Sequence, residues 1–202
     1  MDKEFYLIRH AESMGNTGMD FGYDPGLSPR GHAQAKYCAE AMKQFTDPDT
    51  LLFSSPFERC LATAEAIAEV SGLKVTIMPA LHEHFVAESF PIRKVKLESM
   101  KVKAQKHNFV TGVYDDSQWW PEKNEQREDL NIRMAMFRNQ LTGPRFTASK
   151  IVCVGHLPSL LALAEAMVPD EMFRFSNAGI TKINYINGKF SDEFINSLCL
   201  QD

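Results

Sequence analysis

Residues 150–158 read Lys-Ile-Val-Cys-Val-Gly-His-Leu-Pro. The apolar run 151–154 predicts a strand that is buried on both faces, and the turn Gly155-His156-Leu157 ends it. Pro158 is favoured in the first turn of a helix, and the apolar positions that follow extend this helix to about Met167. A strand, a short turn and a helix in this order form the repeating unit of a parallel sheet.

The same order of elements begins the chain. A strand is predicted from Phe5 to Arg9, and a helix from Pro29 to about Phe45 follows a glycine-rich loop. Ser28 is the expected N-cap of this helix, because its hydroxyl can accept a hydrogen bond from a free backbone N–H group, and Pro29 suits the first helical position.

A further copy of the unit lies between these two. It consists of a strand at 51–54 and a helix from Pro56 to about Val70. Ser55 and Glu58 have the spacing of a capping box, and Gly72 stands where a left-handed residue often ends a helix.

These units together predict an α/β fold, with a mainly parallel central sheet covered by helices on both faces, in a single domain spanning residues 1–202. A short strand is expected at 74–78, and the tail at 180–194 indicates a hairpin with an Asn187-Gly188 turn. Residues 84–124 break the rhythm, and we expect them to form an insertion, or cap, over the active-site end of the sheet.

Two features of this insertion leave its purpose open. A group of cations either attracts the distal groups of an anionic substrate or forms a solvated helix face. Trp119 and Trp120 either cap a pocket or anchor the insertion on the core. The cations are Arg93, Lys94, Lys96, Lys101, Lys103 and Lys106.

Composition argues against several classes of protein. The 202 residues carry a formal net charge of -4, so no basic field favours a nucleic acid or a membrane surface as partner. No apolar run approaches the roughly 18 residues of a membrane span, and no secretory signal is expected. The cysteines Cys38, Cys60, Cys153 and Cys199 are scattered, which favours reduced, buried thiols and a cytoplasmic location. The sequence does not predict an oligomeric state.

Each strand–turn–helix unit delivers a cation or an imidazole to the carboxyl ends of the strands, where ligands of open α/β sheets collect. These residues are Arg9, His10, Arg59 and His156. Arg59 breaks a local rule, because the first turn of a helix carries partial positive charge and disfavours a cation. An anion bound between Arg59 and the free backbone N–H groups would remove the conflict, so this edge of the sheet is a candidate oxyanion site.

The segment Leu7-Ile8-Arg9-His10-Ala11-Glu12-Ser13 resembles the signature of the histidine phosphatase superfamily, which includes the cofactor-dependent phosphoglycerate mutases. The resemblance covers nearly the whole chain except about 85–123. Matching segments follow in order at Asn16, 27–35, 54–64, 81–83, 154–156 and 177–181. The stretch 124–126, with Asp129 and Arg133, keeps the spacing of the family's Gly-Glu-Ser…Asp…Arg pattern but lacks its Gly and Ser.

The resemblance implies a phosphomonoester hydrolase that acts through a phosphohistidine on His10. A neutral His10 would attack in line through one ring nitrogen while the other donates to a carbonyl. Glu83 would protonate the leaving group and then deprotonate the attacking water.

The resemblance also implies a phosphate site made by Arg9, Asn16, Arg59 and His156, with His156 protonated once phosphate is bound. Neither a metal nor an organic cofactor is implied. The expected partner is a small phosphorylated substrate or a phosphoprotein.

Two alternatives share the phosphate site. A phosphoglycerate mutase-type phosphotransferase has the same first half-reaction, but Ser13-Met14-Gly15-Asn16 replaces the Trp-Asn segment of the mutases. A phosphate-binding module without turnover is less favoured, because His10 and Glu83 are both present.

Other phosphatase chemistries fit less well. A metallohydrolase would take His82 and His84 as ligands, with His10 or His156, but zinc would not explain the two arginines. We expect His82 and His84 to be polar loop residues instead. A cysteine-based phosphatase requires an arginine six residues after its cysteine, and none follows Cys38, Cys60 or Cys153 at that spacing.

Two acidic features have local interpretations. Asp47-Pro48-Asp49-Thr50 precedes a strand, so a turn is expected there and not an aspartyl nucleophile. Glu12 is either a partner of Arg9 or a loop carboxylate.

Overall fold

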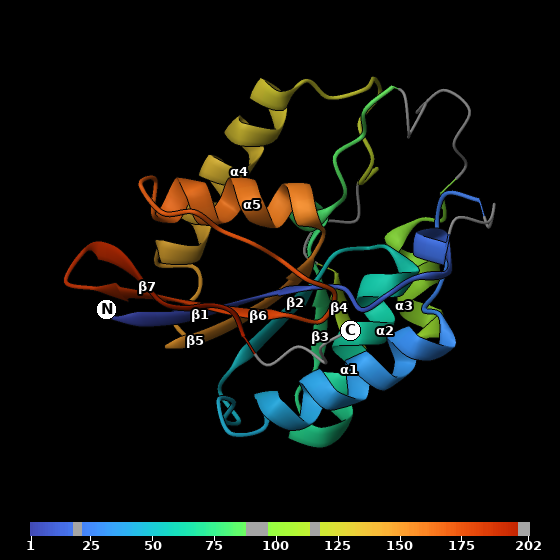
Figure 1. Ribbon diagram of the computed structural model, residues 1–202, viewed down its shortest axis with the longest axis horizontal. Coiled ribbons are helices and arrows are strands. Elements are labelled where there is room, and N and C mark those ends of the chain that lie inside the picture. Colours follow the sequence, from blue (N-terminus) through green and yellow to red (C-terminus); the bar gives the residue numbers. More distant parts are fainter. Residues whose placement is uncertain (18–21, 88–96, 114–117, 198–202) are drawn as a thin grey trace.

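The computed structural model describes residues 1–17, 22–87, 97–113 and 118–197. Its core is a seven-stranded sheet in the order β4-β3-β2-β5-β1-β6-β7 (Figure 1). The strands β4, β3, β2, β5 and β1 run parallel, whereas β6 and β7 are antiparallel to their neighbours, so the predicted mainly parallel α/β sheet is confirmed. The strands are β1 (Lys3–Arg9), β2 (Leu51–Ser54), β3 (Val75–Ile77), β4 (Val110–Val113), β5 (Lys150–Gly155), β6 (Ile180–Ile186) and β7 (Lys189–Ser197).

Helices cover both faces of the sheet (Figure 1). The alternation of side chains along β1 separates two cores: Tyr6 and Ile8 pack with α1 and α2, whereas Phe5 and Leu7 pack with α4 and α5. All four side chains are buried, which is why the strand reads as a continuous apolar run. The helices are α1 (Pro29–Met42), α2 (Glu58–Ser71), α3 (Met100–Lys106), α4 (Arg127–Thr142) and α5 (Leu157–Met167), with short 3-10 turns η1 (Met14–Thr17) and η2 (Pro79–Leu81).

Local signals in the sequence set several boundaries. Ser28 caps α1 by accepting a hydrogen bond from Gly31 N, as predicted. Gly72 ends α2 with φ 74°, and the hairpin turn has Asn187 at φ 52° and Gly188 at φ 82°. Both turn residues lie in the left-handed region that a two-residue hairpin of this type requires.

The predicted start of α2 is wrong. The helix begins at Glu58, two residues after Pro56, and Phe57 occupies the N-cap without a side-chain hydrogen bond. The expected capping box does not form, because Ser55 Oγ lies 2.8 Å from His156 Nε2 and Glu58 N donates instead to Asp24 Oδ1 at 2.8 Å. A residue far away in the sequence therefore supplies the cap.

The segment expected to be an insertion also contributes to the sheet. Residues 110–113 form β4, which pairs in parallel with β3 at the edge. Trp119 is buried, packs against Phe57 and Phe85, and donates to Glu98 O, so it anchors the segment on the core. Residues 84–87 remain at the carboxyl end of the sheet, where His84 and Val86 line the cleft described below.

The cations of this segment differ in their environments. Lys103 is buried and pairs with Asp24 at 2.5 Å and Glu58 at 2.7 Å, so it does not belong to a solvated helix face. Lys106 is exposed and pairs with Glu98. Arg93, Lys94 and Lys96 lie outside the described residues, as does Cys199.

Other local expectations hold within the described chain. Asp47 Oδ1 accepts hydrogen bonds from Asp49 N and Thr50 Oγ1, which makes residues 47–50 a turn. Cys38, Cys60 and Cys153 are buried, and Cys60 and Cys153 carry free thiols. Among the described residues, no helix combines the length and the apolar character that crossing a bilayer demands.

Candidate active site

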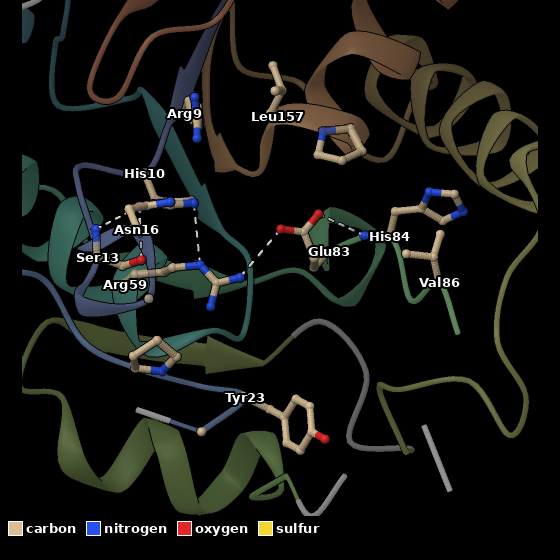
Figure 2. Close-up of a pocket in the computed structure, with 14 residues that line it drawn as sticks. Arg9, His10, Ser13, Asn16, Tyr23, Arg59, Glu83, His84, Val86 and Leu157 are labelled. Carbon is tan, nitrogen blue, oxygen red and sulfur yellow. Dashed lines mark hydrogen bonds and ion pairs between the residues drawn. The ribbon is translucent and has the colours of Figure 1, made fainter. Parts of the chain in front are cut away.

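The carboxyl ends of four parallel strands meet at one cleft of about 450 Å³. β1 leads directly into Arg9 and His10, β2 leads to Arg59 on α2, β3 leads through η2 to Glu83, and β5 leads to His156 at the start of α5. Figure 2 shows His10, Arg59 and Glu83 side by side in this cleft, with Arg9 and Asn16 beside them. The structure thus brings together the six residues predicted from the sequence.

His10 has one ring nitrogen fixed and one directed at Arg59. Nδ1 lies 2.7 Å from Ala11 O, so it carries the proton that this carbonyl accepts. Nε2 lies 3.3 Å from Arg59 Nε. Burial, followed by the charge of Arg59, holds the pKa of His10 well below its usual range, so the ring is neutral at pH 7.

The late part of the chain supports the backbone at His10. Asn177 Nδ2 donates to His10 O at 2.9 Å, and Ala178 N donates to Arg9 O at 3.0 Å. Thr63 Oγ1, on α2, accepts from Ala11 N at 3.1 Å. Three bonds from two separate parts of the chain, the segment 177–178 and α2, therefore fix the segment that carries the imidazole.

Arg59 lies at the centre of the cluster. Its Nη2 is 3.4 Å from Glu83 Oε2 and 3.2 Å from His156 Nδ1, and its guanidinium carbon is 4.4 Å from the centroid of the Phe57 ring. The neighbouring carboxylate of Glu58 pairs with Lys103 and His107. Glu12 Oε1 instead accepts from Ser28 Oγ at 2.6 Å and thus ties the first loop to α1 rather than to Arg9.

Arg9 keeps a donor available. Its Nη1 donates to Phe175 O at 3.0 Å, whereas its buried Nε has no partner in the described part of the chain. A buried donor without a partner is costly, and an anion in the cleft would satisfy it. Asn16 has the same character, because its Oδ1 accepts from Ser13 N and Ser13 Oγ, which leaves the amide NH₂ group to donate.

Glu83 and His156 contact each other, and both contact Arg59. Glu83 Oε2 lies 3.3 Å from His156 Nδ1, and Glu83 Oε1 accepts from His84 N at 3.0 Å. Burial opposes ionisation of Glu83, yet His156 and Arg59 outweigh it and hold the pKa of the carboxyl well below its usual range. Burial lowers the pKa of His156 to about 4, so at pH 7 the ring is neutral and Arg59 is the cation that stabilises the carboxylate.

His156 is fully buried and does not itself line the cleft. Its Nε2 lies 2.8 Å from Ser55 Oγ and 3.4 Å from Cys60 Sγ, and its Nδ1 faces Arg59 and Glu83. Ser55 was not anticipated as a partner of His156, because its place before a helix explained it as a cap. The signal in the sequence that could have found it is the position of Ser55 within the segment 54–64, which resembles the family.

His82 and His84 flank Glu83 without joining a metal site. His82 is buried with Nδ1 2.6 Å from Glu83 O, and His84 Nε2 lies 3.2 Å from Glu125 O. No group of three or more metal-ligating side chains forms within residues 1–17, 22–87, 97–113 and 118–197, so the metallohydrolase alternative lacks a ligand set there. His84, with Tyr23, Val86 and Leu157, lines the outer part of the cleft, which the sequence did not indicate.

The comparisons with known proteins show which family this chain belongs to. The family model of the histidine phosphatase superfamily (branch 1) matches residues 5–197, and the chain belongs to that superfamily. Among curated proteins, it is 27% identical over 203 residues to "Putative phosphoserine phosphatase 2" of Hydrogenobacter thermophilus, covering 98% of this chain and 97% of that protein. It is 25% identical over 174 residues to glucosyl-3-phosphoglycerate phosphatase of Mycolicibacterium vanbaalenii, covering 82% and 74%.

Solved structures agree on the fold. The alpha-ribazole phosphatase of Shigella flexneri superposes with a TM-score of 0.72, at 19% sequence identity, over 98% of both chains. At this identity, the likeness concerns the fold alone.

Proposed function

We propose that the protein is a phosphomonoester hydrolase in which Nε2 of His10 attacks phosphorus and carries the phosphoryl group as a phosphohistidine. The observation that carries this proposal is the orientation of the ring: Nδ1 is occupied by Ala11 O, and Nε2 lies in the cleft beside Arg59. A neutral imidazole with a fixed tautomer is ready to attack without first losing a proton. The family membership and the phosphatases among its relatives support the hydrolytic activity.

The phosphoryl oxygens would be bound by Arg9, Asn16 and Arg59. All three residues line the same cleft, and their donors are the Nε of Arg9, which has no partner among the described residues, the amide NH₂ of Asn16 and the guanidinium of Arg59. A phosphomonoester dianion repels anionic nucleophiles. Neutralising its charge and aligning the attacking atom therefore supply most of the catalysis in phosphoryl transfer. His156 does not line the cleft in the ligand-free site, so it would become a charged donor to the phosphate only after Arg59 and Glu83 move from its Nδ1, with the phosphate dianion stabilising its proton.

Glu83 would act as the general acid and then as the general base. In the ligand-free site it is a carboxylate paired with Arg59. A bound phosphoryl dianion competes for Arg59 and repels the carboxylate, which raises the affinity of Glu83 for a proton. The protonated acid would pass this proton to the leaving oxygen, and the carboxylate would then deprotonate the water that attacks phosphohistidine.

A small phosphomonoester is the proposed substrate class, in a reaction that needs no metal ion and in a cytoplasmic setting. The cleft is within the size range of small-molecule sites, and the relatives are named for phosphoserine and for glucosyl-3-phosphoglycerate. Cys60 and Cys153 are buried as free thiols, which agrees with a reducing compartment.

Trapping of the intermediate tests the proposal. Enzyme mixed with 4-nitrophenyl phosphate and quenched within one turnover should contain an acid-labile, alkali-stable phosphoprotein, which His10→Ala should lack along with all phosphate release. Activity should persist in excess chelator. Retained turnover in His10→Ala, or loss of activity on chelation, would refute the mechanism, and transfer to an added alcohol or phosphorylated acceptor in preference to water would favour the mutase alternative.

A further inference from the structure

Glu83 lies in a stretch of chain that has little regular structure of its own. The 3-10 turn η2 ends at Leu81, and residues 82–86 form neither helix nor strand. Backbone groups outside regular elements are mobile unless other contacts fix them. Proton transfer to a leaving oxygen requires hydrogen-bond geometry, so something must hold this stretch in place.

Arg133, on α4, contacts the backbone just before Glu83. Its Nη1 donates to Ala80 O at 2.6 Å and to His82 O at 3.1 Å. These carbonyls lie three residues and one residue before Glu83. The guanidinium therefore fixes the approach of the chain to the carboxylate.

Glu125 contacts the backbone just after Glu83 and also binds Arg133. Its two oxygens accept from Arg133 Nε and Nη2, both at 2.9 Å, in a bidentate pair. Glu125 Oε2 also accepts from Phe85 N at 3.3 Å, and Glu125 N donates to Phe85 O at 2.9 Å. Asn124 Nδ2 adds a third bond, to Phe85 O at 2.7 Å.

The pair is built to be rigid. The side chains of Arg133 and Glu125 are only 14% and 8% exposed, and a planar fork against a carboxylate fixes orientation as well as distance. Neither residue lines the cleft that holds His10 and Arg59. Any effect of the pair on the reaction must pass through the segment that it holds.

We propose that Glu125 and Arg133 are positioning residues that grip the backbone on both sides of Glu83 and set the place of its carboxyl against the leaving oxygen. This inference rests on the proposed role of Glu83 as general acid. It predicts a specific defect, because only substrates whose leaving group needs a proton depend on where that carboxyl lies.

The test compares two substrates in matched variants. Arg133→Lys keeps the charge but loses the fork, and Glu125→Gln keeps the size but loses the charge. For each variant, kcat/KM is measured with glycerol phosphate, which has an alkoxide leaving group, and with 4-nitrophenyl phosphate. The ratio of kcat/KM with glycerol phosphate to kcat/KM with 4-nitrophenyl phosphate should fall about tenfold. The reason is that misplacing a general acid, which contributes about 10²–10⁴ to the rate, removes part of its effect.

The control lies on the same helix. Arg127 pairs with Glu165 at 3.0 Å in an exposed ion pair, so Arg127→Gln removes a salt bridge of α4 without touching residues 80–85. Its ratio should stay at the wild-type value. Asn124→Ala leaves the Glu125–Arg133 ion pair intact and removes the bond to Phe85 O. It should shift the ratio in the same direction, and it serves as the test if either charge variant fails to fold.

A double mutant separates this inference from the proposed function. If Arg133 acts through Glu83, Arg133→Lys should lower the ratio in the wild type and leave it unchanged in the Glu83→Gln background. A normal ratio in Arg133→Lys and Asn124→Ala, with Glu83→Gln showing the alkyl-specific loss, would overturn the positioning role alone. Equal loss on both substrates in Glu83→Gln would overturn the acid role itself, and the inference with it.

Discussion

Near pH 7, an exposed histidine usually exists in both the neutral and the charged form, and only the neutral form can act as a nucleophile. His10 gains the neutral form from its surroundings, because burial and then Arg59, His156 and Arg9 disfavour the charged ring. The hydrogen bond from Nδ1 to Ala11 O then decides that Nε2 is the nitrogen that carries the lone pair. The same arginines that attract a phosphate dianion therefore also prepare the imidazole.

Ser55 has a comparable effect on His156. Its hydroxyl is the close partner of Nε2, at 2.8 Å in a fully buried environment. Ser55→Ala should leave this nitrogen without its hydroxyl partner, destabilise the fold by about 1–3 kcal/mol, and lower kcat with 4-nitrophenyl phosphate by roughly tenfold. Steady-state kinetics and urea unfolding would measure the two effects.

Ser54→Ala is the matched control for this change. Ser54 is equally buried, but its hydroxyl donates to Ser55 O and not to His156. Its kcat should remain close to that of the wild type. A normal kcat in folded Ser55→Ala would show that the hydroxyl does not orient His156 for the reaction.

At the scale of elements, α1 lies directly against the catalytic loop at Gly31. A Cβ on Gly31 would lie 1.9 Å from Glu12 O, two residues beyond His10. Alanine favours a helix over glycine by about 1 kcal/mol, but a clash with backbone costs about 1–3 kcal/mol or more. Gly31→Ala should therefore lower the free energy of unfolding and displace the loop that carries His10.

Unfolding in urea and kcat/KM together check this expectation. Gly26→Ala is the control, because a Cβ there meets no atom within 4 Å. It should leave both values nearly unchanged. A Gly31→Ala protein as stable and active as the wild type would mean that α1 can move away without consequence.

Local patterns predicted most elements, and long-range contacts account for those that differ. The three strand–turn–helix units, the Ser28 cap and the Asn187-Gly188 hairpin depend on residues a few positions apart, so sequence alone was sufficient. The start of α2 was misplaced because its cap comes from Asp24 and because Ser55 binds a histidine 101 residues away. Rules based on the spacing of nearby residues cannot predict either of these long-range contacts.

The same reasoning applies to the candidate site and the edge of the sheet. The strand ends located Arg9, His10, Arg59 and His156, whereas the contacts of Glu125 and Arg133 with residues 80–85 arise only in the folded chain. The residues of β4 gave no strand signal, because Val110–Val113 is short and contains a glycine. Its pairing with β3 supplies what the local sequence lacks.

At the scale of the whole molecule, the histidines should give stability a maximum near neutral pH. Burial lowers the pKa of His10, His82 and His156, so below about pH 6.5 the unfolded chain binds protons that the folded protein does not. The free energy of unfolding should then fall as pH decreases, by about 1.4 kcal/mol per pH unit for each of them. For His156 this loss ends near its folded pKa of about 4.

His107 acts in the opposite direction. Hydrogen bonds to Glu58 and Glu65 raise its pKa to about 9, so its contribution is complete below about pH 6.5 and is lost as pH rises through 9. Urea unfolding at pH 5.5, 7 and 9 measures both arms, and His107→Gln should flatten the alkaline one. Stability that rises steadily from pH 7 to 5.5 would contradict the buried neutral histidines.

The bonds from Asn177 and Ala178 to the backbone at His10 and Arg9 join residues that are synthesised almost at opposite ends of the described chain. When β1 and His10 have been translated, the residues that support the backbone of His10 have not yet been made. The emerging polypeptide thus remains without a finished catalytic pocket until Ala178 has left the exit tunnel, and a nonsense mutation between residues 11 and 177 would remove this support while sparing the Arg-His pair.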